Sequence, residues 1–244
     1  MELDWLTAEA RFLLTQGIIL TLVITFFTSM FAFVLGIAAG TARLKGNQAI
    51  KTIARIYIEI HRNIPALVLV IFWAFAVPNI FPQSLRQQIF FNNTFWNQIS
   101  ELTGIALPYY LLAGALGLTL NTSAYLAELF RAGVNSIPSE HIESARSLGA
   151  NSRVVFWQVL LPSGVQTAFP AMSTRLIHNF KNTALLSLVA VPIFFHGIQA
   201  AISKTFRATE FLLLAAVVYL VLTAILARLL RSAENGLFPK RANG

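Results

Sequence analysis

Cysteine is absent from the sequence, and charged residues are scarce. The 244 residues contain no Cys, which excludes disulfides, cysteine nucleophiles and thiolate metal sites in this chain. Charged side chains make up only 11% of the residues and hydrophobic ones 56%, which is too apolar for an ordinary soluble domain. The composition therefore favours a chain solvated by lipid over a soluble helical protein with apolar residues on every face.

Charge-free stretches divide the chain into segments of membrane-spanning length. A helix needs about 20 mostly apolar residues to cross a bilayer. Six stretches lack Asp, Glu, Lys and Arg, and most of them have about that length: 12–42, 63–85, 102–127, 154–174, 182–203 and 211–227. The sequence therefore predicts an all-α integral membrane protein, organised as a single domain over residues 1–244.

The distribution of Lys and Arg decides between two topologies, which differ over residues 154–203. The net charge of +8 reflects basic cytoplasmic loops in a membrane protein and does not indicate nucleic-acid binding. Six spans would put 10 Lys and Arg on the cytoplasmic side and 8 outside. Five spans put 12 inside and 4 outside, with Arg175 and Lys181 in the membrane. The positive-inside rule favours five spans.

The five spans are predicted at residues 17–41, 60–80, 107–132, 165–190 and 209–230. This topology places the amino terminus outside and the carboxyl terminus in the cytoplasm. Residues 79–106 are expected to form an external loop with some interfacial helix, in which Trp96 suits the headgroup region. Residues 191–208 are expected to form a helix on the outer surface.

One cytoplasmic segment, residues 136–162, has more order in its pattern than a flexible linker. Gly149 suits the left-handed end of a first helix. Asn151 suits the start of a second helix, predicted over Arg153–Leu161 and ended by Pro162. The segment therefore predicts two short helices at a sharp angle, outside the membrane.

The same segment resembles the EAA loop of ABC importer permeases. That loop has the pattern Glu-Ala-Ala, then a Gly, then an apolar-x-Leu-Pro ending. Here the matching residues are Glu143-Ser144-Ala145, Gly149 after a three-residue gap, and Val159-Leu160-Leu161-Pro162. Ser144 is the one departure, and serine is small enough to keep close packing. An ordinary amphipathic helix could carry Glu, Ala and Gly, but the full spacing before a span favours the EAA loop.

Outside the loop, the chain is similar to the polar amino-acid branch of these permeases over roughly residues 16–238. The matching stretches are Gln16-Gly17, Thr21-Leu22, Arg62-Asn63-Ile64-Pro65-Ala66-Leu67, Asn121-Thr122-Ser123-Ala124-Tyr125-Leu126-Ala127-Glu128, Lys181-Asn182-Thr183-Ala184-Leu185 and Thr205-Phe206-Arg207. The branch usually has Gly-Thr at Asn63-Ile64 and Thr-Ser at Thr183-Ala184. These departures leave the substrate open.

The resemblance implies the transmembrane subunit of an ABC importer that moves amino acids across the cytoplasmic (inner) membrane of a bacterium. It implies a second permease subunit, identical or homologous, two ATPase subunits, and a periplasmic or lipid-anchored amino-acid-binding protein. The residues implied in ATPase docking are Glu143, Ser144, Ala145, Gly149, Leu161 and Pro162. ATP and Mg would be bound by the ATPase, because this chain has no Gly-rich GKS/T loop. We expect no enzymatic activity, cofactor or metal ion in this chain.

Polar side chains within the predicted spans are candidates for a substrate path, because charge is costly at bilayer depth. A small zwitterion needs a cation for its carboxylate and acceptors for its ammonium group. The candidates are Lys181, Asn182, Asn121, Thr122, Ser123 and Tyr125. Lys181 could instead snorkel to the interface or pair with a partner chain.

Other polar residues of the spans have simpler interpretations. Arg175 is expected to be structural, and His178 and Asn179 to form interhelical hydrogen bonds. Glu128 and Arg131 are one helical turn apart and are expected to pair with each other.

Other functions stay open as alternatives. An ABC permease for opines or short peptides would share these motifs. A secondary transporter or channel would also have polar groups in the membrane but no reason to carry an EAA loop. A membrane-embedded enzyme is disfavoured, because the chain has no Gly-x-Ser-x-Gly or His-Glu-x-x-His motif.

Overall fold

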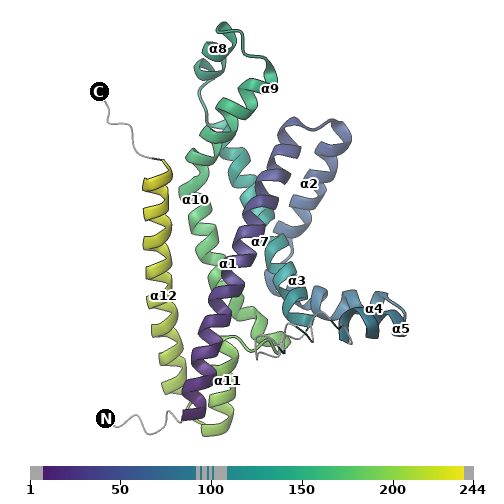
Figure 1. Ribbon diagram of the computed structural model, residues 1–244, viewed down its shortest axis with the longest axis vertical. Coiled ribbons are helices and arrows are strands. Elements are labelled where there is room, and N and C mark those ends of the chain that lie inside the picture. Colours follow the sequence, from purple (N-terminus) through teal and green to yellow (C-terminus); the bar gives the residue numbers. More distant parts are fainter. Residues whose placement is uncertain (1–7, 92–93, 95–97, 99–100, 102–108, 239–244) are drawn as a thin grey trace.

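The computed structural model describes residues 8–91, 94, 98, 101 and 109–238, and these contain helices but no strand. The all-helical prediction is confirmed for this part of the chain. In chain order the elements are α1 (Ala8–Lys45), α2 (Gln48–Asn63), α3 (Ala66–Ile71), η1 (Phe72–Ala76), α4 (Val77–Ile80), α5 (Gln83–Arg86), η2 (Gln87–Phe91), α7 (Tyr109–Asn135), α8 (Ser139–Ser147), α9 (Ser152–Val154), η3 (Val155–Leu160), α10 (Leu161–Asn182), η4 (Thr183–Val189), α11 (Phe194–Thr205) and α12 (Ala208–Leu237). The long helices run along one axis, and α1 begins at the end of the bundle opposite to the end of α12 (Figure 1).

Two described helices have the length and composition of membrane spans, Leu14–Lys45 within α1 and the whole of α12. Two bent pairs in the described part reach that length together, α2 with Ala66–Ile80 and Ser152–Val189 with α11. α7 is 27 residues long but falls outside this group, because polar residues such as Asn121 and Thr122 lower its hydropathy. The helices are therefore of spanning length, and the polar α7 lies among them.

Four predicted spans fall on helical segments: 17–41 on α1, 107–132 on α7 from Tyr109 onward, 165–190 on α10 and η4, and 209–230 on α12. The helix predicted within 191–208 is also present, as α11. In the predicted external loop, α5 and η2 are helical, and Trp96 lies outside the described residues.

The predicted span over 60–80 is not one continuous helix. α2 ends at Asn63, and the next helix leaves at an angle of 105°. Pro65 explains the break, because proline lacks an N–H and disfavours the α conformation in the residue before it. Ile64 accordingly has φ −86° and ψ 130°. α2 packs against α1 and α7, and the following short helices run sideways from the bundle (Figure 1).

The prediction that a helix ends at Pro162 is also wrong. The helical backbone continues from Ser152 through Pro162 to Asn182. The π-helical stretch η3 immediately precedes α10, and its wider turn accommodates a proline that cannot make the ordinary α-helical hydrogen bond. The 136–162 loop therefore holds one separate helix, α8, and an extension of α10.

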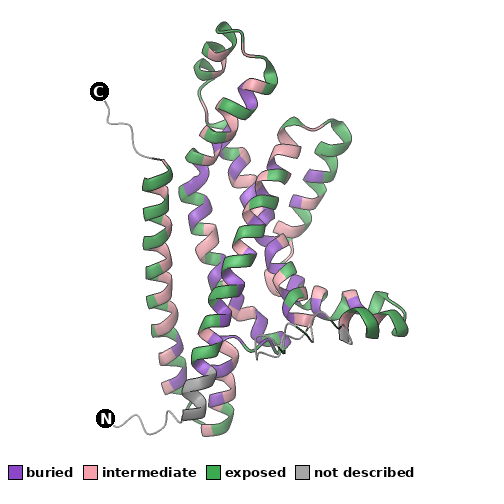
Figure 2. Cartoon of the chain, in the orientation of Figure 1, coloured by how far each residue is buried: buried purple, intermediate pink, exposed green. Residues whose placement is uncertain are grey.

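α7 is the central helix of the bundle. It packs against α1 and α10, and its residues are mostly buried, whereas α12 is largely exposed (Figure 2). A Cβ added to Gly133 would lie 2.5 Å from the carbonyl oxygen of Gly164, so these glycines allow α7 and α10 to approach closely. The exposed face of α12 carries leucines such as Leu213 and Leu220, which suits a helix in lipid.

Candidate functional site

A buried asparagine joins three helices at the centre of the bundle. Asn179 of α10 donates to the hydroxyls of Thr28 and Ser29 in α1, at 2.9 and 3.1 Å. Its side-chain oxygen accepts from Thr122 of α7 at 2.9 Å. The prediction of an interhelical hydrogen bond at Asn179 is confirmed. Both N–H donors of the amide are used within the protein, so the residue holds helices together.

α2 ends partway along the bundle (Figure 1). Side chains of α7 donate hydrogen bonds to the carbonyl groups of the last turn of α2. Such carbonyls have no partner within their own helix. Asn121 donates to the His61 carbonyl at 2.6 Å, and the Tyr125 hydroxyl donates to the Arg62 carbonyl at 3.1 Å. The helix break at Pro65 thus fixes two side chains of the predicted substrate path.

An arginine of α10 lies against the same two side chains. Arg175 donates to the side-chain oxygen of Asn121, and its guanidinium carbon lies 3.9 Å from the centre of the Tyr125 ring. The guanidinium carbon of Arg62 lies 5.4 Å from that centre. The Nε atoms of both arginines are buried and have no hydrogen-bond partner among the described residues. We call Arg62, Asn121, Tyr125 and Arg175 the arginine–tyrosine cluster.

One carboxylate, Glu128, lies one turn further along α7 and contacts three arginines. Its Oε1 accepts from Arg131 at 2.6 Å, and its Oε2 accepts from Arg43 at 2.5 Å. Arg62 is 3.9 Å from Oε2. The predicted pair of Glu128 and Arg131 is confirmed. Glu128 is 21% exposed, so its ion pairs are screened less than surface pairs.

Removal of this carboxylate is expected to destabilise the protein. Glu128→Gln leaves Arg43 and Arg131 without a counter-charge, which we expect to cost about 1–3 kcal/mol. Glu59→Gln is the matched control, because Glu59 pairs with Arg55 at 3.1 Å on an exposed helix face. Such pairs contribute about 0–1 kcal/mol. The midpoint temperature of thermal unfolding in detergent is measured for both variants. The same midpoint for Glu128→Gln and Glu59→Gln would contradict the assigned role of Glu128.

Lys181 lies apart from the arginine–tyrosine cluster. It is six positions after Arg175 in α10, which corresponds to about 9 Å along the helix axis and about 120° around it. Lys181 lines a separate cavity of about 400 Å³ with residues that include Tyr219 and Thr223 of α12. The hydroxyls of both residues are buried without a hydrogen-bond partner in the described structure. The structure therefore places Arg175, and not Lys181, against Asn121.

The other predicted path residues occupy three different settings. The Thr122 hydroxyl donates its hydrogen bond to the side-chain oxygen of Asn179. Ser123 is buried and shares a hydrogen bond with the Tyr57 hydroxyl of α2. Asn182 is half-buried at the carboxyl end of α10. Asn121 and Tyr125 are thus the predicted path residues that contact a cation.

The 136–162 loop extends beyond the end of the bundle (Figure 1). Gly149 follows α8 with a φ of +85°, so the predicted left-handed glycine is confirmed. α8 exposes Glu143, and the side chain of Leu148 is 89% exposed. An exposed leucine at the tip of a short helix suits a contact with another protein.

The remaining predicted docking residues lie on both sides of this tip. Ser144 is exposed and Ala145 half-buried in α8, whereas Leu161 and Pro162 lie in the first turn of α10. Asn151 accepts from the N–H groups at 153 and 154, both at 3.0 Å, which confirms the predicted helix cap.

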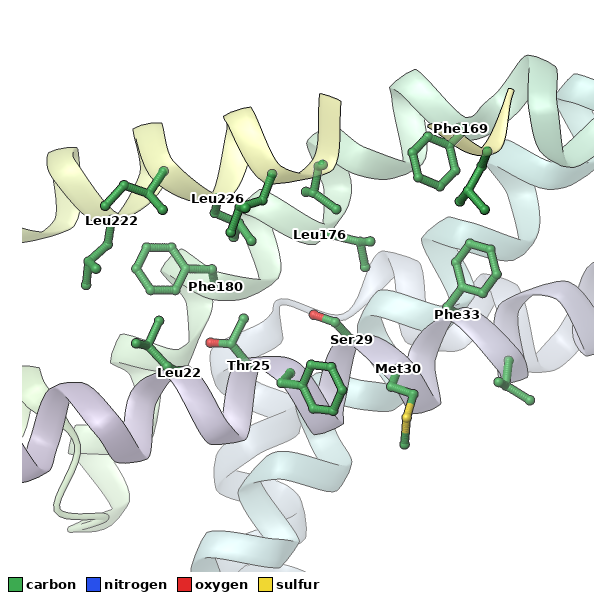
Figure 3. Close-up of a pocket in the computed structure, with 16 residues that line it drawn as sticks. Leu22, Thr25, Ser29, Met30, Phe33, Phe169, Leu176, Phe180, Leu222 and Leu226 are labelled. Carbon is green, nitrogen blue, oxygen red and sulfur yellow. The ribbon is translucent and has the colours of Figure 1, made fainter. Parts of the chain in front are cut away.

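An apolar groove of about 590 Å³ lies between α1, α10 and α12 (Figure 3). Its only polar lining residues are Thr25 and Ser29. The Thr25 hydroxyl donates to the Thr21 carbonyl at 2.7 Å, and Ser29 accepts from Asn179. The groove has no charged side chain for a zwitterion, so we do not assign it as the substrate site.

The contacts of Arg62 and Arg175 with Tyr125 are not predicted by the sequence, from which Arg175 is expected only to be structural. A signal for Arg62 is present, because Pro65 ends α2 and leaves the last turn of that helix inside the bundle. Arg175 has no comparable signal. Its contact with Tyr125 depends on how α10 is rotated against α7, which only the tertiary structure fixes.

Comparison with known proteins identifies similar chains over most of this length. Residues 32–236 match the family described as binding-protein-dependent transport system inner membrane component. The arginine transport system permease protein of Corynebacterium glutamicum is 30% identical over 207 residues, 84% of this chain and 62% of that protein. The octopine transport system permease protein of Rhizobium meliloti is 30% identical over 96% of this chain and 89% of that protein. The crystal structure of an amino acid ABC transporter with histidines has a TM-score of 0.74 at 26% identity, covering 96% of this chain and 99% of that chain.

Proposed function

Since this chain belongs to the family of binding-protein-dependent transport system inner membrane components, we propose that it is the membrane-spanning subunit of an ATP-driven amino-acid importer. The observation that carries the proposal is the family match over residues 32–236. The amino acid ABC transporter of similar fold supports the same substrate class. The octopine permease makes an opine the second candidate.

ATP hydrolysis takes place on partner ATPase subunits, which dock on α8 and on the start of α10. The exposed position of α8 at the end of the bundle supports this role (Figure 1). A short rigid helix transmits a displacement that a flexible loop would absorb. A second permease subunit and a binding protein on the outer side complete the importer.

Co-purification tests the ATPase partnership. A tagged chain purified from the membranes of its own host is expected to bring an ATPase with it. A variant in which residues 139–147 are replaced by a Gly-Ser linker of equal length is expected to lose that ATPase. If the wild-type chain carried no ATPase activity, the proposed function would be wrong; if the linker variant kept it, docking through α8 would be wrong.

The chain crosses the bacterial inner membrane five times, with its amino terminus outside and its carboxyl terminus in the cytoplasm. The spans are α1, α2 with the bent α3 segment, α7, α10 and α12. The opposite ends at which α1 begins and α12 ends support an odd number of crossings (Figure 1). The excess of Lys and Arg on one side supports the orientation.

Single cysteines test this topology without background, because the native chain has none. Thr209 is exposed in the first turn of α12, which follows α11. Ser147 is exposed at the end of α8. Thr209→Cys is expected to react with an impermeant maleimide added outside intact cells. Ser147→Cys is expected to react only after the membrane is opened. The reverse pattern would overturn the orientation.

The substrate path passes the arginine–tyrosine cluster. Arg175 binds the carboxylate of the amino acid, and Asn121 and Tyr125 hold Arg175 in place. Thr122 and Ser123 fix α7 against its neighbours. Lys181, with Asn182 beside it, is the second candidate for the carboxylate, and the unpaired hydroxyls in the Lys181 cavity favour it.

A further inference from the structure

Positive charge exceeds negative charge around the arginine–tyrosine cluster. Glu128 already binds Arg43 and Arg131 at 2.5 and 2.6 Å, and it lies 3.9 Å from Arg62. Arg175 makes no ion pair with a carboxylate in the described part of the chain. The Glu128 carboxylate is therefore the counter-charge for three arginines, and Arg175 has no counter-charge among the described residues.

No other acidic side chain of the described residues forms an ion pair with an arginine of this cluster. Glu59 is already paired with Arg55 on an exposed face of α2. The sequence has no Asp after Asp4. Of its other Glu residues after the start of α1, Glu9 lies in the first turn of that helix, Glu101 between η2 and α7, Glu140 and Glu143 in α8, and Glu210 and Glu234 in the end turns of α12. A second copy of this chain would bring the same excess of arginines.

Two buried N–H groups at the cluster have no acceptor. The Nε atoms of Arg62 and Arg175 are buried and have no hydrogen-bond partner among the described residues. Both guanidiniums lie against the ring of Tyr125, so their carbon atoms are less than 10 Å apart. A small ligand with two anionic groups could therefore contact both arginines at once.

We propose, on the basis of the proposed function, that the amino acid carried past this cluster has a second carboxylate, as glutamate and aspartate do. One carboxylate binds Arg175 and the other binds Arg62. The two carboxylates supply the missing acceptors and reduce the excess of positive charge. An amino acid with a cationic side chain would meet uncompensated positive charge at the same place, so the cluster selects against it.

Direct binding to the purified permease–ATPase complex tests the proposal. Equilibrium dialysis is done without the binding protein, because that protein selects amino acids on its own. Radiolabelled glutamate is expected to bind, unlabelled aspartate to compete, and arginine and glutamine to compete at least about tenfold less well. Arg175→Glu is expected to weaken glutamate binding by about tenfold or more. Arg55→Gln removes a positive charge from an exposed pair and is expected to leave binding unchanged.

The outcomes separate the charge preference from the importer function. Binding of arginine or glutamine as tight as that of glutamate would overturn the inference and leave the amino-acid importer standing. Unchanged glutamate binding by Arg175→Glu would also overturn it. Arg62→Gln serves as the second variant if Arg175→Glu fails to assemble with the ATPase, and it is expected to weaken glutamate binding. A chain that carries no ATPase and binds no amino acid would contradict the proposed function itself.

Discussion

Valine in place of Gly149 is expected to abolish most ATP-driven uptake while the bundle still inserts and folds. Gly149 has a φ of +85°, which β-branched residues strongly disfavour. A Cβ at this position meets nothing within 4 Å, so the effect comes from backbone conformation and not from crowding. α8 would then end differently and lose its fixed position relative to α10. Uptake and ATPase stimulation in proteoliposomes should fall together.

Gly236 provides the matched control. A Cβ at Gly236 also meets nothing within 4 Å, but this glycine lies in the regular helix α12 and has no positive φ. Gly236→Val is therefore expected to retain uptake. Normal transport by Gly149→Val, with the ATPase still bound, would show that the shape of the α8 end does not matter for coupling.

Glutamine in place of Arg175 is expected to reduce the initial rate of amino-acid uptake by about tenfold or more, the loss typical of one charge-assisted hydrogen bond. Methionine in place of Lys181 is expected to have a smaller effect, because Lys181 lies outside the arginine–tyrosine cluster. Initial rates are measured in proteoliposomes, with expression and ATPase association checked for each variant. The opposite ranking would assign the carboxylate to Lys181 and its cavity.

The long helices could be predicted from the sequence because lipid imposes a simple requirement on composition. The spans over 17–41 and 209–230 are apolar for long enough to be recognised by counting. α2 escapes that count because it carries Lys51, Arg55 and Glu59 on its exposed side. Pro65 marks the end of α2, but charge-free length alone selects mainly the residues after that proline and so misses most of α2.

Local features of the 136–162 loop follow from backbone chemistry and are therefore predictable. Gly149 is left-handed and Asn151 caps the next helix, as the residue types indicate. Pro162 is expected to end a helix but does not. A proline in the first turn of a helix destabilises it little, and the π-helical turn before Pro162 lets the helix continue.

The polar residues of the candidate site could be predicted from the sequence, but the cation that contacts them could not. Polar residues in an apolar segment stand out, so Asn121 and Tyr125 can be selected from the sequence. The choice between Arg175 and Lys181 depends on the rotation of α10, since six residues turn a side chain by about 120°. That rotation is fixed by Asn179, whose partners come from two other helices.

The central claim is that this chain forms the membrane path of an importer driven by ATP. Its most direct test is uptake of a labelled amino acid by proteoliposomes that contain this chain with its ATPase, with the binding protein outside. ATP or a non-hydrolysable analogue is enclosed, and ionophores remove any ion gradient. We expect accumulation that requires ATP hydrolysis and continues in the presence of ionophores. Equal uptake with the analogue, or uptake abolished by ionophores, would contradict it.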